Sequence, residues 1–85
     1  MAAFKRDETL RAFGAIIKDA RLNKGLYQRE VAEMMGVTEA CYSQIERGKR
    51  DLSFTTALNI CAILGINFNK FIKTLKEKEN STSGQ

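Results

Sequence analysis

The stretch GVTEACYSQIERGKR, residues 36–50, carries the side chains best suited to directed polar contacts. Its glutamine and its arginines can each make paired hydrogen bonds to the edges of bases in a major groove. The two cations at its end, Lys49 and Arg50, can bind phosphate groups. Few of its side chains are apolar, so the segment buries little of itself. We therefore expect it to contact something outside its own domain.

A helix over residues 39–47 is predicted here, because Thr38 can serve as its N-cap and Gly48 can end it. At about 100° per residue, three side chains fall within about 60° of one direction and form a narrow buried stripe: Tyr42, Ile45 and Glu46. The opposite side carries small or hydrogen-bonding side chains, with two more residues on its flanks: Ala40, Ser43, Gln44 and Arg47, flanked by Glu39 and Cys41. A face of this kind can approach another surface closely.

No arrangement of residues in the chain indicates catalysis or metal binding. The sequence contains no histidine, no glycine-rich phosphate loop and no nucleophile elbow. Its two cysteines are too few for a zinc site or a disulfide framework. We interpret Cys61 as a core residue and Cys41 as a small residue that fits near a sugar-phosphate backbone, with a redox sensor as the alternative for Cys41. We expect no enzyme, and no cofactor, metal or small-molecule ligand.

The composition indicates one small globular domain. The 85 residues are 44% hydrophobic and 28% charged, and the net charge is +4. This charge is compatible with a polyanionic partner but is weak evidence alone. The longest apolar stretch, residues 60–66, is far too short to cross a bilayer, and the N-terminal segment lacks the apolar run of a signal peptide. We expect no membrane contact and a cytoplasmic location.

Capping signals predict four further helices and no strand. They cover residues 8–24, capped by Asp7 or Thr9 and ended by Gly25; 28–35, ended by Gly36; 54–64, between Ser53 and Gly65; and 68–78, capped by Asn67. The expected fold class is all-α, with one five-helix domain over 8–78, a flexible N-terminus over 1–7 and a disordered tail over 79–85. Gly14 lies inside the first helix. Close packing of another backbone would explain a glycine there, and so would a position with no structural requirement for one.

Four motifs extend over most of the chain: FGAIIKDAR, KGLYQREVAEMMGVT, SQIERGKR and LNICAILGI. With Gln28 opening the second helix, Ala32 at a helix crossing and Gly36 in the turn, the pattern resembles the lambda-repressor/Cro-like, or XRE, family. The resemblance covers about residues 13–75. It implies a lambda-repressor-like domain in which the second and third helices form a helix-turn-helix that binds double-stranded DNA.

The resemblance also implies roles for individual residues. Base contacts would come from Glu39, Ala40, Ser43, Gln44 and Arg47. Phosphate or backbone contacts would come from Tyr27, Gln28, Cys41, Lys49 and Arg50. A partly buried ion pair between Arg21 and Glu46 would join the first and third helices.

Three positions depart from the usual family pattern. Tyr27 stands where the family usually has threonine, which affects the capping of the second helix. Tyr42 stands where an aliphatic residue is usual, so its buried hydroxyl needs a partner. Glu39 stands where glutamine or arginine is frequent. A glutamate can accept a hydrogen bond from cytosine N4, or it can repel phosphates from a wrong register.

The fourth and fifth helices carry more apolar surface than so small a domain is expected to hide. We predict a two-fold homodimer interface that includes Ile60, Ile63, Phe68, Phe71 and Ile72. The alternative is that the fifth helix folds over the fourth and covers this surplus.

These observations predict a transcriptional regulator, a repressor with activation as a further mode, that binds an inverted-repeat operator as a homodimer and is associated with the nucleoid. The first alternative is an antitoxin-like or tethering module that binds a protein partner, with DNA contact secondary. A nucleoid-structuring protein without sequence preference is a second alternative. The amide and hydroxyl groups on the outer face of the third helix argue against it.

Overall fold

The computed structural model describes the backbone of residues 5–83 and the side chains of residues 5–77. Within this part the chain forms five α-helices and no strand, which confirms the predicted all-α class. The helices are α1 (Arg6–Asn23), α2 (Gln28–Met35), α3 (Glu39–Glu46), α4 (Phe54–Leu64) and α5 (Phe68–Ser83).

Two predicted N-caps at the C-terminal half of the chain are confirmed, and α2 and α4 have the predicted bounds. Ser53 Oγ accepts a hydrogen bond from the backbone N–H of Thr56 at 3.1 Å, which caps α4. Asn67 Oδ1 accepts from the backbone N–H of Lys70 at 3.1 Å, which caps α5. Short polar side chains before an apolar run thus mark the starts of α4 and α5.

The outer ends of α1 and α5 differ from the prediction. α1 begins at Arg6, so neither Asp7 nor Thr9 is its N-cap; Lys5 has that position and makes no side-chain capping bond. α5 continues through residues 79–83, where a disordered tail was predicted. No proline or glycine interrupts its backbone ladder before Gly84, so nothing in the sequence forces an earlier end. Residues 1–4 and 84–85 of the predicted flexible ends lie outside the described part.

Gly36 sets the direction of the chain between α2 and α3. It ends α2 with a φ of +75°, a conformation that favours glycine. The next residue, Val37, donates its backbone N–H to the carbonyl of Ala32 at 3.0 Å. Thr38 then caps α3 directly. The two helices of the turn are therefore joined by three residues with a fixed course.

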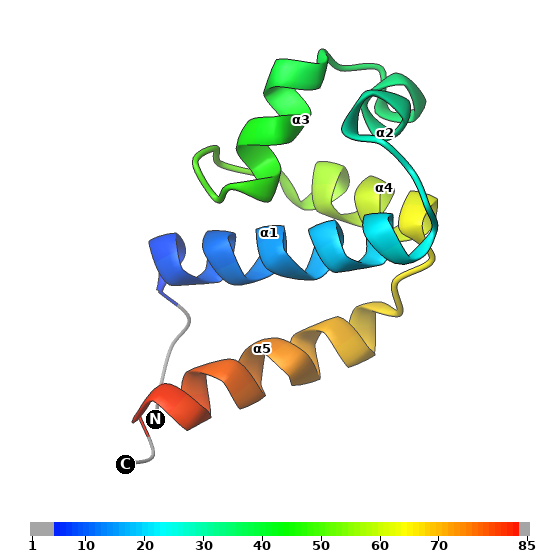
Figure 1. Ribbon diagram of the computed structural model, residues 1–85. Coiled ribbons are helices and arrows are strands. Elements are labelled where there is room, and N and C mark those ends of the chain that lie inside the picture. Colours follow the sequence, from blue (N-terminus) through cyan, green and yellow to red (C-terminus); the bar gives the residue numbers. More distant parts are fainter. Residues whose placement is uncertain (1–4, 84–85) are drawn as a thin grey trace.

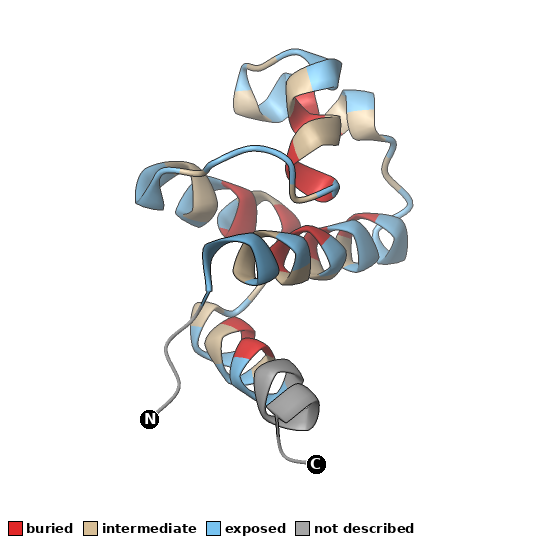
Figure 2. Cartoon of the chain, turned by 90° about the vertical axis from the view of Figure 1, so that its left-hand side faces the viewer, coloured by how far each residue is buried: buried red, intermediate tan, exposed pale blue. Residues whose placement is uncertain are grey.

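α1 is the central helix of the fold. It packs against α3, α4 and α5, while α2 packs against α3 and α4. In Figure 1, α2, α3 and α4 lie on one side of α1 and α5 lies on the other. The buried positions line the inner faces of the helices (Figure 2), and among the largest are Ile17, Val31, Tyr42 and Ile60.

Packing of α5 on α1 corrects part of the predicted dimer interface. The ring of Phe71 meets the ring of Phe13 edge to face, with the centroids 4.9 Å apart. Phe71 is 7% exposed and Ile60 is fully buried, so a single chain already covers both residues. They cannot form an interface with a second copy. α4 packs against α1 and α2, and α5 packs against α1, so one chain hides both residues mainly in this way rather than by folding of the fifth helix over the fourth.

Part of the apolar surplus nevertheless stays at the surface. Phe54 is 68% exposed and Leu58 is 37% exposed, one turn apart on α4. The half-buried Phe68 places its ring 6.1 Å from that of Phe54, centroid to centroid. We call these three residues the apolar strip. Ile63 and Ile72 of the predicted interface are also only partly buried.

Gly14 allows α1 and α3 to approach closely. A Cβ placed on Gly14 would lie 2.2 Å from the backbone carbonyl oxygen of Glu46 and 2.8 Å from that of Ile45. Of the two explanations for a glycine inside α1, close packing of another backbone is therefore the correct one. The end of α3 rests on α1 at this point.

Gly14→Ala should destabilise the protein, although an alanine normally favours a helix by up to about 1 kcal/mol. The added methyl group meets backbone, which cannot move aside, and overpacking of this kind costs about 1–3 kcal/mol. Thermal or urea unfolding measures the loss. Ala15→Gly, on the exposed side of the same turn, calibrates the helix propensity alone. A higher melting temperature for Gly14→Ala than for the wild type would contradict the close contact.

Candidate nucleic-acid interface

The burial of α3 agrees with the predicted division of its faces. Tyr42, Ile45 and Glu46 are its buried residues. The other side is open: Glu39, Ala40 and Arg47 are exposed, and Cys41, Ser43 and Gln44 are half-buried. The residues predicted to contact bases therefore lie on accessible positions along α3 and at its end. The helix ends at Glu46, so Arg47, predicted as its last residue, is its C-cap.

The two ends of α3 are closed by local hydrogen bonds. Thr38 Oγ1 accepts from the backbone N–H of Cys41 at 3.1 Å, which confirms Thr38 as the N-cap. At the other end, the N–H of Lys49 donates to the carbonyl of Gln44 at 2.9 Å. These bonds leave the outer side chains free of any role in ending the helix.

A buried ion pair fixes α3 to the rest of the domain. Arg21 Nε donates to Glu46 Oε2 at 2.6 Å and Arg21 Nη2 donates to Glu46 Oε1 at 3.2 Å. The side chains of Arg21 and Glu46 are only 9% and 2% exposed. Gln28 Nε2 also donates to Glu46 Oε1, at 2.9 Å, and Arg21 Nη1 donates to the carbonyl of Leu26 at 2.8 Å. The predicted pair is present, more deeply buried than expected, and it joins α1, α2 and α3.

The hydrogen bonds of Glu46 keep its carboxylate charged. Burial alone would raise the pKa of Glu46, but the bonds from Arg21 and Gln28 hold this pKa below its ordinary value. Because the folded pKa is depressed, the carboxylate contributes stability above the ordinary glutamate pKa. That contribution is lost as the pH falls through the folded pKa.

Tyr42 does not find the partner that its buried hydroxyl was expected to need. The residue is fully buried, and its hydroxyl makes no hydrogen bond within the described part of the chain. Burial, followed by the nearby Glu46 carboxylate, raises the pKa of this hydroxyl. The ring of Tyr42 and the side chain of Ile45 are the apolar groups that α3 buries in the core.

The start of α2 presents Tyr27 to the outside. Tyr27 is 68% exposed, and its side chain does not cap the helix. Glu30 compensates, because its Oε1 accepts from the backbone N–H of Tyr27 at 2.8 Å. The threonine that is usual here is therefore not required for capping. Gln28 directs its amide nitrogen to Glu46, so a phosphate could reach only the remaining groups of this residue.

Arg29 belongs to this surface although the sequence did not single it out. Its guanidinium carbon lies 5.8 Å from the ring centroid of Tyr27, in a cation–π contact. Arg29 lines a hollow between the starts of α2 and α3, together with Arg21, Tyr27, Gln28 and Glu39. Its position directly after Gln28, in the first turn of α2, was the signal that could have identified it.

The loop after α3 adds the two predicted phosphate-binding cations. Lys49 and Arg50 are both exposed. Arg50 Nη1 donates a long hydrogen bond, 3.4 Å, to Oε1 of Gln44 on α3. The loop cations and the outer face of α3 thus form one continuous surface.

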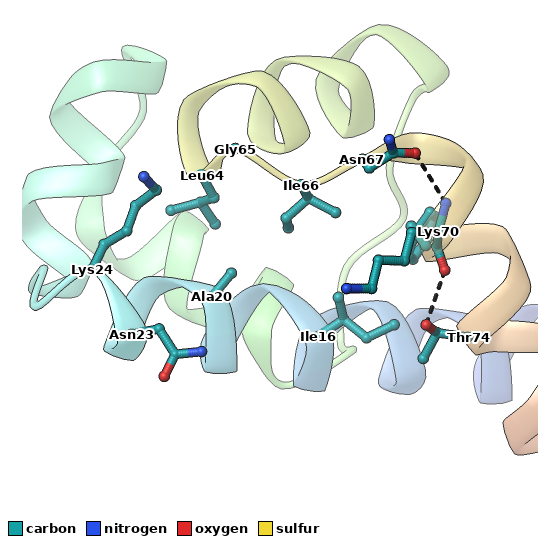
Figure 3. Close-up of a pocket in the computed structure, with 11 residues that line it drawn as sticks. Ile16, Ala20, Asn23, Lys24, Leu64, Gly65, Ile66, Asn67, Lys70 and Thr74 are labelled. Carbon is teal, nitrogen blue, oxygen red and sulfur yellow. Dashed lines mark hydrogen bonds between the residues drawn. The ribbon is translucent and has the colours of Figure 1, made fainter.

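A separate hollow of about 490 Å³ lies between α1, the end of α4 and α5 (Figure 3). Its lining includes the apolar side chains of Ile16 and Leu64 and the cations Lys24 and Lys70. None of its lining residues comes from α2 or α3. It is therefore no part of the candidate interface.

Within the described residues 5–83, no helix has the length and hydrophobicity that crossing a membrane requires. No group of three or more potential ligand side chains gathers there in a way that could hold a metal ion.

Comparison with known proteins agrees with this geometry. A family model described as helix-turn-helix matches residues 17–71. The chain is 31% identical over 61 residues to the uncharacterized HTH-type transcriptional regulator YqaE of Bacillus subtilis (strain 168), a match that covers 72% of this chain and 53% of that protein. It is 36% identical over 56 residues to the ImmF control region 10 kDa protein of Bacillus phage phi105, covering 66% of this chain and 62% of that one. The chain thus spans less than two thirds of each relative.

Among solved structures, the clp gene regulator ClgR from Corynebacterium glutamicum superposes with a TM-score of 0.78. The two are 26% identical, and the superposition covers 91% of this chain and 82% of that one. The likeness extends over nearly all of the five-helix fold.

Glu46→Ala should destabilise the fold far more than Glu33→Ala, because Glu33 is exposed on α2. Removal of Glu46 leaves a buried arginine without its partner, which costs about 3–5 kcal/mol. Urea unfolding at neutral pH measures both variants. The difference should shrink as the pH falls below the ordinary glutamate pKa. Equal midpoints for the two variants at neutral pH would reject the structural role of the pair.

Proposed function

Because the chain belongs to the lambda-repressor/Cro-like family of helix-turn-helix proteins, we propose that it regulates transcription by binding double-stranded DNA through the outer face of α3. The observation that carries this proposal is the difference between the buried side and the open side of α3. Three of its residues hold it in the domain, and the rest form a face of small or hydrogen-bonding side chains. Such a face suits insertion into a major groove.

The distribution of cations around α3 supports the proposal. The helix has eight residues, so its length is about 12 Å. That is about the width of the major groove of B-DNA. Arg29 lies near the start of α3, and Arg47, Lys49 and Arg50 lie at its end. Positive charge at both ends would face the two phosphate backbones that border the groove.

We assign base contacts to the outer residues of α3: Glu39, Ala40, Ser43, Gln44 and Arg47. We assign phosphate or backbone contacts to the residues around them: Tyr27, Gln28, Cys41, Lys49 and Arg50, with Arg29 added from the structure. Since the Gln28 amide nitrogen binds Glu46, the contact of Gln28 with phosphate would use its backbone N–H at the start of α2.

A homodimer on an inverted repeat completes the proposal. One eight-residue helix offers few base contacts, and a second copy doubles them. The apolar strip of Phe54, Leu58 and Phe68 is the surface that favours self-association, because its rings and methyl groups remain open to solvent. We also assign the partly buried Ile63 and Ile72 to this interface.

Repression would follow when the dimer occupies a promoter, and activation when it lies beside the polymerase. The similarity to a control-region protein of phage phi105 favours a regulator of phage or prophage type. Such a protein would act in the cytoplasm on the nucleoid. A protein-binding module is the competing function, and the experiments below separate the two.

The protein should be a dimer at micromolar concentration, and Phe54→Glu should be a monomer because it places a charge in the apolar strip. Analytical ultracentrifugation measures both. Binding of the wild type to duplex DNA should weaken steeply with salt, since each neutralised phosphate contributes about −0.9 to the log–log slope. A wild type that sediments only as a monomer, both free and on DNA, would refute the dimer.

Gln44→Ala and Lys49→Ala should separate base contact from phosphate contact. The Gln44 amide can donate and accept, and a bidentate contact with adenine is worth about 1–3 kcal/mol of discrimination. Its loss should weaken binding to the preferred DNA sequence. The affinity for a duplex of scrambled sequence and the salt dependence of binding should stay almost unchanged. Lys49 is a point charge on the loop, so its loss should weaken binding to both duplexes and reduce the salt slope by about one unit.

Fluorescence anisotropy titrations of both variants, on both duplexes and over a salt series, provide the measurement. Equal weakening of both duplexes by Gln44→Ala would mean that α3 does not recognise bases. The protein-binding function would then be favoured.

A further inference from the structure

The loop between α3 and α4, residues 47–53, is fastened to α1 although it carries two exposed cations. Gly48 lies directly on α1, since a Cβ there would be 2.7 Å from the Cα of Arg11. Leu52 is partly buried against the core. Lys49 and Arg50 lie between these two anchors. In Figure 1 the loop lies beside the N-terminal end of α1.

An ion pair provides the third anchor. Arg6 Nε donates to Asp51 Oδ1 at 2.8 Å, and Arg6 Nη2 donates to Asp51 Oδ2 at 2.6 Å. The two side chains thus meet in a planar, two-bond fork, the strongest geometry that a surface pair of this kind adopts. Both remain accessible, with side-chain exposures of 65% for Arg6 and 69% for Asp51. The pair ties the first residue of α1 to the residue that follows Arg50.

By its charge alone, Asp51 is unfavourable for phosphate binding by this loop. A carboxylate next to Lys49 and Arg50 offsets part of the positive charge that attracts phosphate. Its fork with Arg6 offers a reason for its presence. A flexible loop would have to be ordered when DNA binds, and a loop that is already fixed avoids this entropic cost.

We propose that Arg6 and Asp51 are positioning residues for DNA binding, whose ion pair holds Lys49 and Arg50 in place against α1 for contact with phosphate. The proposal rests on the proposed function, because it assigns a purpose to a loop that binds DNA. It also makes a prediction that opposes simple electrostatics. Removal of the negative charge of Asp51 should weaken DNA binding rather than strengthen it.

Asp51→Asn is the test, with Glu8→Gln as its matched control. Glu8 is exposed in the first turn of α1 and forms no ion pair within the described residues, so its neutralisation changes the net charge equally without touching the loop. Anisotropy titrations on one duplex should show Asp51→Asn binding roughly two- to fivefold more weakly than the wild type, the range that an exposed ion pair permits. Glu8→Gln should bind equally or slightly more tightly.

A double-mutant cycle isolates the pair from the charge of Arg6. Arg6→Gln removes both a positive charge and the fork. If the pair positions the loop, the combined variant should bind almost as well as Arg6→Gln alone, because the fork can be lost only once. Additive losses, or an Asp51→Asn variant that binds as tightly as Glu8→Gln, would overturn the proposal.

Hydrogen exchange in the free protein distinguishes this proposal from the proposed function. The N–H of Lys49 is bonded to the carbonyl of Gln44, so its exchange rate reports whether the loop is fixed. Asp51→Asn should accelerate this exchange and Glu8→Gln should not. If the wild type binds no duplex DNA, the proposed function fails, and exchange alone decides whether the pair holds the loop. If the exchange rate of the Lys49 N–H is unchanged in Asp51→Asn, the ion pair does not hold the loop, and this proposal fails as well.

Discussion

The contacts of Glu46 are the interaction on which the rest of the structure depends. Its carboxylate binds Arg21 of α1 and Gln28 of α2, and its backbone carbonyl lies against Gly14 of α1. α3 buries only two large apolar side chains, too few to fix the orientation of an eight-residue helix by packing alone. The buried, hydrogen-bonded carboxylate helps to fix the orientation of α3, because a carboxylate buried at this point is stable only when its donors are in place.

This arrangement separates the two duties of α3. Its inner side holds the helix, and its outer side makes few structural contacts, so substitutions at Ser43 and Gln44 should leave the fold intact. The cations around α3 are likewise held in place by the fold. Arg29 and the loop residues Lys49 and Arg50 lie around the helix on segments that are themselves anchored, which limits the ordering cost when a partner binds.

Much of this could be predicted from the sequence because the signals are local. Thr38, Ser53 and Asn67 mark helix starts, and the period of α3 separates Tyr42 and Ile45 from the outer face. The pair of Arg21 and Glu46 came from the family resemblance. What failed depends on tertiary packing. α4 packs against α1 and α2, and α5 packs against α1, so Ile60 and Phe71 are core residues. Only the structure could choose between the two explanations of Gly14. The fork between Arg6 and Asp51 joins residues 45 positions apart, which no periodicity reports.

The central claim is that the outer face of α3, held by Glu46, recognises a DNA sequence. Selection of bound duplexes from a random pool by the wild-type protein tests it most directly. We expect enrichment of a two-fold symmetric motif whose half-site centres lie about one helical turn, roughly 10–11 base pairs, apart. A pool that remains random in sequence after repeated selection by the folded protein would contradict it.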